Sequence, residues 1–160
     1  SMAAALSAVQ RQLGQTYPVV IDNQPVPTAE HLDSVNPSHS AQVVGRCGKA
    51  TADDANRAVA SCLRAFDAWR DTPVEERAAF LRRSAAVMRR RRWELAAWIV
   101  LETGKPWREA DADVAEAIDF CEYYAAEAVR LWHPQRRDVP GEDNAYFYEP
   151  RGVAVVIAPW

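Results

Sequence analysis

Cysteine is scarce in this sequence and forms no recognisable pattern. The chain has three, Cys47, Cys62 and Cys121, which are widely spaced, and no CxxC or Cys/His cluster occurs. A structural zinc site and a disulfide framework are therefore not indicated, and reduced thiols in the cytoplasm are expected. Cys62 and Cys121 fall on apolar helical positions, so we interpret the cysteines as structural residues and not as nucleophiles.

Long hydrophobic runs and an excess of basic charge are also absent. No apolar run approaches the roughly 20 residues that a membrane-spanning helix needs. The formal net charge is −3, which gives no general attraction to nucleic acid. The run 89–92 (RRRR) is basic, but four successive helical residues point to all sides. We interpret this run as a solvated helix surface with a bend near Arg92.

A GxGxxG motif, the usual fingerprint of dinucleotide binding, is missing. The run 153–157 (VAVVI) nevertheless contains four β-branched residues between Gly152 and Pro159. Such a run predicts a strand buried on both faces of a parallel sheet. A strand of this kind needs neighbours, so we expect the chain to be the front part of a longer protein.

Shorter elements are expected before this strand. Residues 3–16 predict a short helix or a loosely held arm, and we interpret Ser1-Met2 as a remnant of recombinant expression that lies outside the fold. Residues 17–22 and 42–46 predict short strands, with proline and asparagine turn formers between them.

Three helices are expected in the middle of the chain, over residues 51–71, 72–103 and about 109–132. Thr51 and Asp54 predict a capping box for the first helix, and Thr72 followed by proline predicts the cap of the second. Gly104 suits a left-handed cap at the end of the second helix. Apolar positions with helical spacing predict a buried face on each helix, the first through Val59, Leu63 and Trp69. The order of strands, helices, hairpin and strand indicates an α/β fold.

Four segments together resemble the amino-terminal part of an aldehyde dehydrogenase. They are Asn36-Pro37, ETGKP (102–106), EPRGV (149–153) and IAPW (157–160), and the resemblance covers nearly the whole chain from Tyr17. Within that superfamily, residues 104–125 and PGEDN (140–144) resemble the L-glutamate γ-semialdehyde dehydrogenases of proline catabolism. These enzymes are also called 1-pyrroline-5-carboxylate dehydrogenases.

The resemblance implies a domain organisation. Residues 1–16 would be an arm, and residues 17–138 the amino-terminal part of the NAD-binding domain. Residues 139–152 resemble an oligomerisation hairpin, which implies a homodimer or higher assembly. Residues 153–160 would begin the first strand of a Rossmann-type NAD domain.

The resemblance also implies a function for the full-length protein, the NAD-dependent oxidation of L-glutamate 5-semialdehyde to L-glutamate in the cytoplasm. The family's catalytic cysteine and glutamate lie further downstream, so no catalytic residue is expected in these 160 residues, and the isolated chain is expected to be inactive. Ile157, Ala158, Pro159 and Trp160 are implied to border the NAD cleft.

Glu116 is the one substrate-binding candidate. Its helical position alone favours an ordinary solvent-exposed glutamate. The resemblance matches it to an acidic position that faces the substrate entrance, which gives the hypothesis that Glu116 orients the substrate's ammonium group.

Three alternatives remain open from the sequence. The protein could act on another aldehyde, such as succinate semialdehyde, on the same scaffold. It could be a non-catalytic helical module that binds a partner, since no catalytic constellation is visible in these residues. It could also be fused to a proline dehydrogenase domain. Neither the choice between NAD and NADP nor the oligomer symmetry follows from these residues, and no metal, nucleic-acid or membrane partner is expected.

Overall fold

The chain begins with a helix that packs against the protein. In the computed structural model, which describes residues 1–158, α1 (Met2–Gln10) lies against α4 (Arg92–Thr103). Val9 is fully buried and Met2 is buried beside it in the main hydrophobic core. The predicted short helix is therefore confirmed, whereas the alternative of a loose arm and the exclusion of Met2 from the fold are wrong, because this helix places its apolar face on α4.

Short strands follow, in two groups. The first is a three-stranded sheet in the order β1-β5-β4, with β1 parallel and β4 antiparallel to β5; the second is the antiparallel pair β2-β3. The bounds are Gln15–Tyr17 (β1), Val19–Ile21 (β2), Gln24–Val26 (β3), His31–Asn36 (β4) and His39–Gly48 (β5).

The predicted strand 17–22 is thus divided between β1 and β2. Pro18, between them, has no backbone N–H for a ladder. The turn between β2 and β3 holds Asp22 and Asn23, both at φ 57°. Two such residues are typical of the tight two-residue hairpin turn. The predicted strand 42–46 is confirmed within the longer β5.

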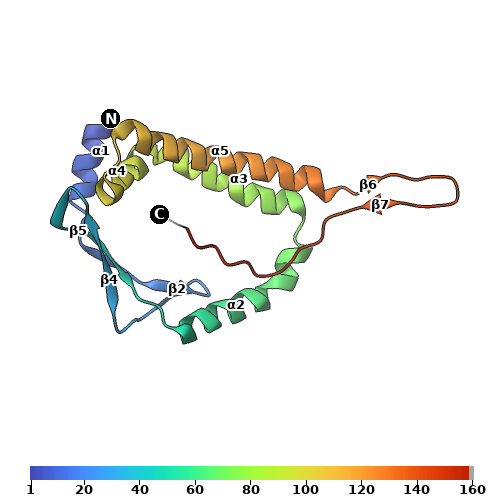
Figure 1. The fold of residues 1–160 in the computed structure, drawn as a ribbon, viewed down its shortest axis with the longest axis horizontal. Coiled ribbons are helices and arrows are strands. Elements are labelled where there is room, and N and C mark those ends of the chain that lie inside the picture. The colour runs from blue at the N-terminus through green and yellow to red at the C-terminus, as the bar shows by residue number, and fades with distance from the viewer. Residues whose placement is uncertain (159–160) are drawn as a thin grey trace.

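Helix α2 (Ala52–Asp71) has the predicted cap but lacks the predicted buried face. The Asp54 amide donates to Thr51 Oγ1 at 3.2 Å, and the Thr51 amide donates to Asp54 Oδ2 at 2.9 Å. No residue of α2 is buried, and Leu63 is 58% exposed. The expected inward stripe is exposed because, among the described elements, α2 packs only lightly, mainly on β2 (Figure 1).

The second predicted helix is divided into α3 (Val74–Arg90) and α4 at Arg91. The φ of −98° and ψ of 13° of Arg91 lie outside the helical region, so the helix is interrupted one residue before the bend expected near Arg92. The predicted Thr72 cap is wrong: Pro73 occupies the cap position, and the Thr72 hydroxyl instead donates to the Ala68 carbonyl at 2.7 Å. The predicted left-handed cap at Gly104 is confirmed, at φ 73°.

Helix α5 (Trp107–Trp132) begins two residues before the expected start and packs along both α3 and α4. Figure 1 shows α3 and α5 lying side by side. Small side chains fill these contacts, which lets the helix axes approach closely. Five alanines have no exposed surface: Ala85, Ala96, Ala97, Ala110 and Ala125. Within residues 1–158, no helix is long and apolar enough to cross a bilayer.

A thin hairpin projects from the end of α5 (Figure 1). It consists of β6 (Gln135–Arg136) paired antiparallel with β7 (Ala145–Tyr146), with a bridge between Val139 and Glu142 nearer the tip. The predicted hairpin boundaries, 139–152, therefore correspond to a structure that begins and ends earlier in the chain. Residues 147–152 lead from it back to the body of the protein, and we call them the strap.

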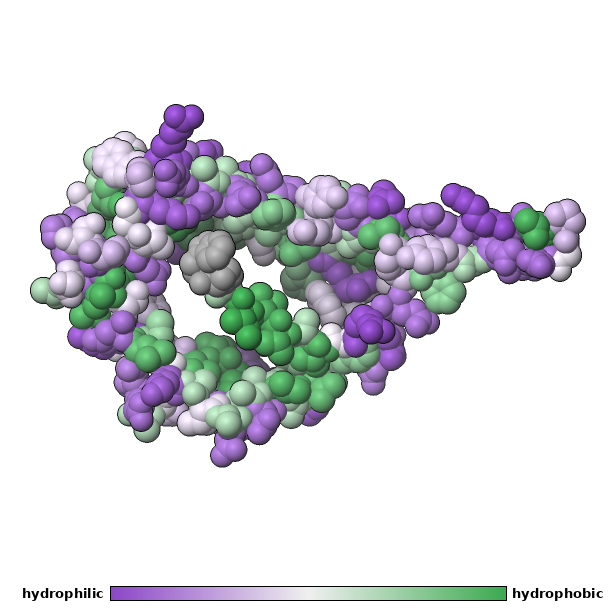
Figure 2. All heavy atoms as spheres, in the orientation of Figure 1, coloured by the Kyte–Doolittle hydropathy of each residue, from purple (hydrophilic) through white to green (hydrophobic). Residues whose placement is uncertain are grey.

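The predicted strand 153–157 is absent from the structure. Residues 153–158 form neither helix nor strand, and Val155, Val156 and Ile157 are 77%, 90% and 85% exposed. A strand requires hydrogen bonds from a neighbour, and no strand among residues 1–158 pairs with this segment. Figure 2 shows its hydrophobic side chains beside those of α2, at the hollow in the middle of the molecule.

Candidate functional site

Two motifs that are distant in the sequence meet at the end of α4. The Ser34 hydroxyl donates to Glu102 Oε1 at 2.8 Å, and a Cβ added at Gly104 would lie 3.0 Å from Pro37 Cγ. Asn36 is buried, and its side chain binds Gln42 Oε1 and the Ser38 amide at 2.8 and 2.9 Å. The Asn36-Pro37 turn and the ETGKP segment therefore form one junction, from which α5 departs.

Ion pairs hold the start of α5 in place. Lys105 Nζ binds Asp113 Oδ2 at 2.6 Å, and the Arg92 guanidinium binds both carboxylate oxygens of Asp111. The hydrogen bond to Asp113 raises the pKa of Lys105, with smaller contributions from the charges of Glu109 and Glu116. The hydrogen bond from Arg92 lowers the pKa of Asp111.

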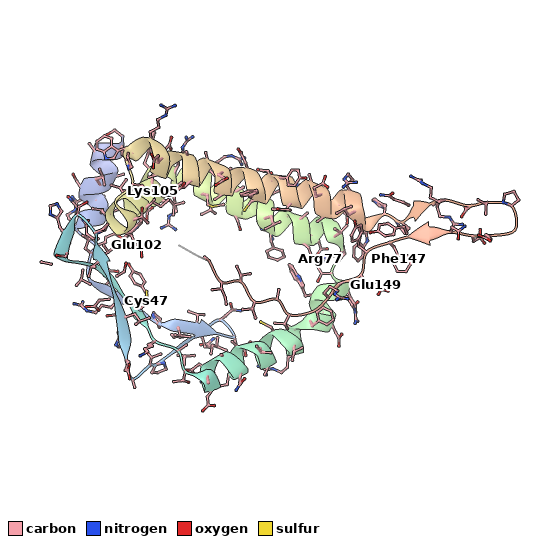
Figure 3. All side chains as sticks on the ribbon, viewed as in Figure 1. Cys47, Arg77, Glu102, Lys105, Phe147 and Glu149 are labelled. Atoms are coloured by element: carbon pink, nitrogen blue, oxygen red, sulfur yellow. The ribbon has the colours of Figure 1, made fainter. Side chains whose placement is uncertain are left out.

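Lys105, which Figure 3 labels near Glu102 at this end of the helices, had no role in the sequence-based prediction. Its ammonium binds Asp113, one turn before Glu116, and the charge of Glu116 contributes to raising the pKa of Lys105. A signal was available: Glu109, Asp113 and Glu116 recur at helical spacing just after Lys105.

Glu116 is exposed and borders a shallow groove along α5. The groove is also lined by Ala112, Ala115, Asp119, Phe120 and Tyr123. Spacings of three, four and seven residues place these side chains on one helical face. The Phe120 and Tyr124 rings stack at 5.8 Å, and Tyr123 meets Tyr124 edge-on at 5.3 Å. A carboxylate beside an aromatic wall suits a ligand with a cationic group and a short apolar chain.

The predicted cofactor residues lie on a different part of the chain. Ile157 and Ala158 are exposed, and Pro159 and Trp160 lie outside the described residues. Residues of α5 alone line the groove at Glu116, so the structure does not join Ile157 or Ala158 to it.

The three cysteines do not converge on a common site. Cys121 is half-buried against the core, as predicted, whereas Cys47 and Cys62 are exposed. The prediction of a core position for Cys62 is wrong because the face of α2 that carries it is not covered. Among residues 1–158, no group of three His, Cys, Asp or Glu side chains is arranged to hold a metal ion.

Comparison with known proteins gives consistent matches. The model of the aldehyde dehydrogenase family matches residues 26–160. The chain is 48% identical over 157 residues to 1-pyrroline-5-carboxylate dehydrogenase 1 of Halalkalibacterium halodurans, and 49% identical over 158 residues to the 1-pyrroline-5-carboxylate dehydrogenase of Geobacillus thermodenitrificans. Both alignments cover 98% of this chain but 30% and 31% of the relatives. The chain therefore spans about a third of the length of the curated relatives it matches.

Solved structures match over a similar region. A 1-pyrroline-5-carboxylate dehydrogenase from Thermus with bound NAD aligns at a TM-score of 0.87 and 46% identity, over 93% of this chain and 29% of that one. Proline utilization A from Bdellovibrio bacteriovorus aligns at a TM-score of 0.90 and 41% identity, over 94% of this chain and 16% of that one. The arrangement of strands and helices described above is thus found in both proteins.

Proposed function

The chain belongs to the aldehyde dehydrogenase family, and from this premise we propose that it is the amino-terminal part of an NAD-dependent 1-pyrroline-5-carboxylate dehydrogenase. In the full-length protein, the reaction would oxidise L-glutamate 5-semialdehyde to L-glutamate. The identity of 46–49% to enzymes of this name, over 93–98% of the chain, is the observation that carries the proposal. The 160 residues supply scaffold and part of the site, and the isolated chain is proposed to be inactive.

Glu116 is proposed to bind the substrate's α-ammonium group. Its carboxylate is exposed at the groove on α5, where an incoming molecule can reach it. The aromatic side chains of Phe120 and Tyr123 border the same groove and suit the substrate's short aliphatic chain. An ionised carboxylate facing an ammonium forms a charge-assisted hydrogen bond, which is stronger than a neutral one.

NAD is the proposed cofactor, and it would accept the hydride removed from the aldehyde. The residues present fit this role, because Ile157 and Ala158 are exposed and available to a ligand. Together with Pro159 and Trp160 they would form one lip of the cofactor cleft. The proposed location of the protein is the cytoplasm.

A substrate panel on the full-length protein tests this function. L-glutamate 5-semialdehyde is expected to give a higher kcat/KM than succinate semialdehyde, with NADH formed in step with aldehyde consumed. The comparison addresses substrate choice within the family, because both aldehydes would use the same scaffold. A preference for succinate semialdehyde would assign the chain to a different aldehyde dehydrogenase.

The hairpin between β6 and β7 is proposed to mediate a homodimer or higher assembly. Tyr146, Phe147 and Tyr148 are 57%, 55% and 51% exposed at its base. Covering one large aromatic side chain is worth about 1.5–3 kcal/mol. In the full-length protein, the double substitution Tyr146→Ser and Phe147→Ser should therefore weaken self-association by at least roughly tenfold, measured by light scattering over a dilution series.

The matched control is Val20→Ser, which removes a side chain that is 63% exposed on β2. It should leave the mass of the assembly unchanged. Equal dissociation of both variants, or a wild-type protein that is monomeric at working concentration, would contradict the role of the hairpin.

A further inference from the structure

Arg77 connects the start of α3 with the end of α5, where the chain leaves the helical block. It lies in the first turn of α3, and its guanidinium carbon is 4.7 Å from the ring centroid of Trp132, the last residue of α5. A guanidinium over an indole ring is a favourable cation–π contact. The contact fixes the Arg77 side chain beside the strap, as Figure 3 shows for Arg77 and Glu149.

A groove of mostly apolar character surrounds this guanidinium. Val74 of α3 and Ala128, Leu131 and Trp132 of α5 form one side, and Tyr148, Glu149 and Pro150 of the strap form the other. Glu149 supplies the carboxylate of this groove. The strap therefore passes the helix ends with an acidic side chain next to a basic one.

One donor of Arg77 is not satisfied. Its Nε is buried and has no hydrogen-bond partner among the described residues. A buried donor of a charged group without a partner is unfavourable, and an arginine fork binds a carboxylate well through Nε and one Nη together. Glu149 is the carboxylate that lines the same groove, and its side chain is exposed and therefore free to change rotamer toward this donor.

The path of the strap depends on few other constraints. Residues 147–158 belong to no strand in the structure, so no ladder hydrogen bonds hold them. Pro150 restricts its own φ, and Gly152 has a φ of 103°, which side-chain-bearing residues rarely adopt. After that bend, Val153 and Ala154 reach the apolar groove on α2 formed by Cys62, Phe66 and Trp69.

We propose that Arg77 is a positioning residue: in the full-length protein its guanidinium binds the Glu149 carboxylate, fixes the strap, and so places residues 153–158 at the cofactor cleft. The inference rests on the proposed NAD-binding role of Ile157 and Ala158. It concerns how the cofactor lip is held in place, and Arg77 itself is not proposed to touch NAD or the aldehyde.

The test uses full-length Arg77→Met, Glu149→Gln and the double variant. NAD affinity is measured by fluorescence titration without aldehyde. Each single substitution is expected to raise the Kd for NAD about tenfold. The Kd of the double variant should not exceed the larger of the two single-variant values, because both substitutions remove the same contact. KM for the aldehyde should stay within about twofold, and Arg77→Lys should restore part of the affinity, since a lysine keeps the charge but not the fork.

Arg83→Met is the matched control. Arg83 is also on α3, and its guanidinium carbon lies 4.3 Å from the Phe80 ring centroid, but it does not line the groove beside the strap. This variant should leave the Kd for NAD unchanged. Glu149→Gln changes an exposed residue, so it keeps the test valid if Arg77→Met fails to fold.

Amide hydrogen exchange of residues 148–158 provides a second readout that does not depend on catalysis or on NAD. Exchange should accelerate in Arg77→Met and in Glu149→Gln and stay unchanged in Arg83→Met. Unchanged exchange and unchanged NAD affinity in Glu149→Gln, or additive effects in the double variant, would overturn the inference. Faster exchange in a protein that does not oxidise glutamate semialdehyde would reject the proposed function and leave the Arg77–Glu149 contact supported.

Discussion

Glu116→Ala in the full-length protein is expected to raise KM for L-glutamate 5-semialdehyde about 10–100-fold, while KM for NAD stays within roughly twofold. The size follows from losing a hydrogen bond between two charged groups, which is worth about 1.5–3 kcal/mol. The selectivity follows from position, because Glu116 lines the groove on α5 and the proposed cofactor residues do not. Steady-state kinetics with each substrate varied in turn measures both constants.

A substrate analogue isolates the ammonium contact. The aldehyde 5-oxopentanoate has the same chain and carboxylate as L-glutamate 5-semialdehyde but no amino group. Glu116→Ala should change its KM by less than about twofold, because no ammonium is present to lose its partner. Glu116→Gln should behave like Glu116→Ala toward the natural substrate, since it keeps the shape and removes the charge.

Glu109→Ala is the control on the same helix. Glu109 is an exposed acid near Lys105 but outside the groove of Glu116. Its removal should leave both KM values close to wild type. Equal effects of Glu116→Ala on the two aldehydes would show that the residue supports the helix and does not recognise the ammonium.

Gly104→Ala is expected to lower the free energy of unfolding of the chain by about 2–3 kcal/mol. Two costs combine at this position. The φ of 73° is unfavourable for any residue with a Cβ, and the new methyl group would lie 3.0 Å from Pro37 Cγ. Urea unfolding followed by circular dichroism measures the change, with the slope of the transition compared between variants.

Gly14→Ala separates the two costs. Gly14 has a similar φ of 77°, but the nearest atom to an added Cβ is the flexible end of Arg46 at 3.9 Å. This variant should lose only about 1–2 kcal/mol, the conformational cost alone. If Gly104→Ala costs no more than Gly14→Ala, then the close contact with Pro37 is not a constraint on the junction.

The Gly104 junction matters for the site because it sets where α5 begins. Lys105 follows the glycine directly and binds Asp113 one turn before Glu116. A shift of the junction would therefore move the acidic face of α5 relative to the sheet. The motif ETGKP and the turn at Asn36-Pro37 are both needed for this arrangement. They lie side by side in space, although 64 residues separate Pro37 from Glu102 in the sequence.

Features that depend on residues close together in the sequence were predictable from it. The capping box at Thr51 and the left-handed cap at Gly104 involve contacts within a few residues, and both are confirmed. The break at Arg91 was foreseen only as a bend. Helix propensity continues through the arginine run, so the local sequence does not predict a division into two helices. Both α3 and α4 pack against α5, and these long-range contacts are visible only in the structure.

Features that depend on what covers a surface were not predictable. Leu63 and Trp69 have the spacing of a buried stripe, yet they are exposed because little of the described chain packs on α2. The β-branched run at 153–157 has strand propensity but no partner strand among residues 1–158. Glu116 and its groove neighbours follow from helical spacing on α5, whereas the hydrogen bond between Lys105 and Asp113 beside them required the structure.

The most direct test of the central claim is the rate of NADH formation by the full-length protein with L-glutamate 5-semialdehyde, measured beside the 160-residue chain at equal molar concentration. The account predicts turnover by the full-length protein and none by the chain alone, because the chain is proposed to contribute scaffold, a substrate-facing carboxylate and one cofactor lip but no catalytic residue. No NADH from the full-length protein with this aldehyde, or turnover by the isolated chain, would contradict it.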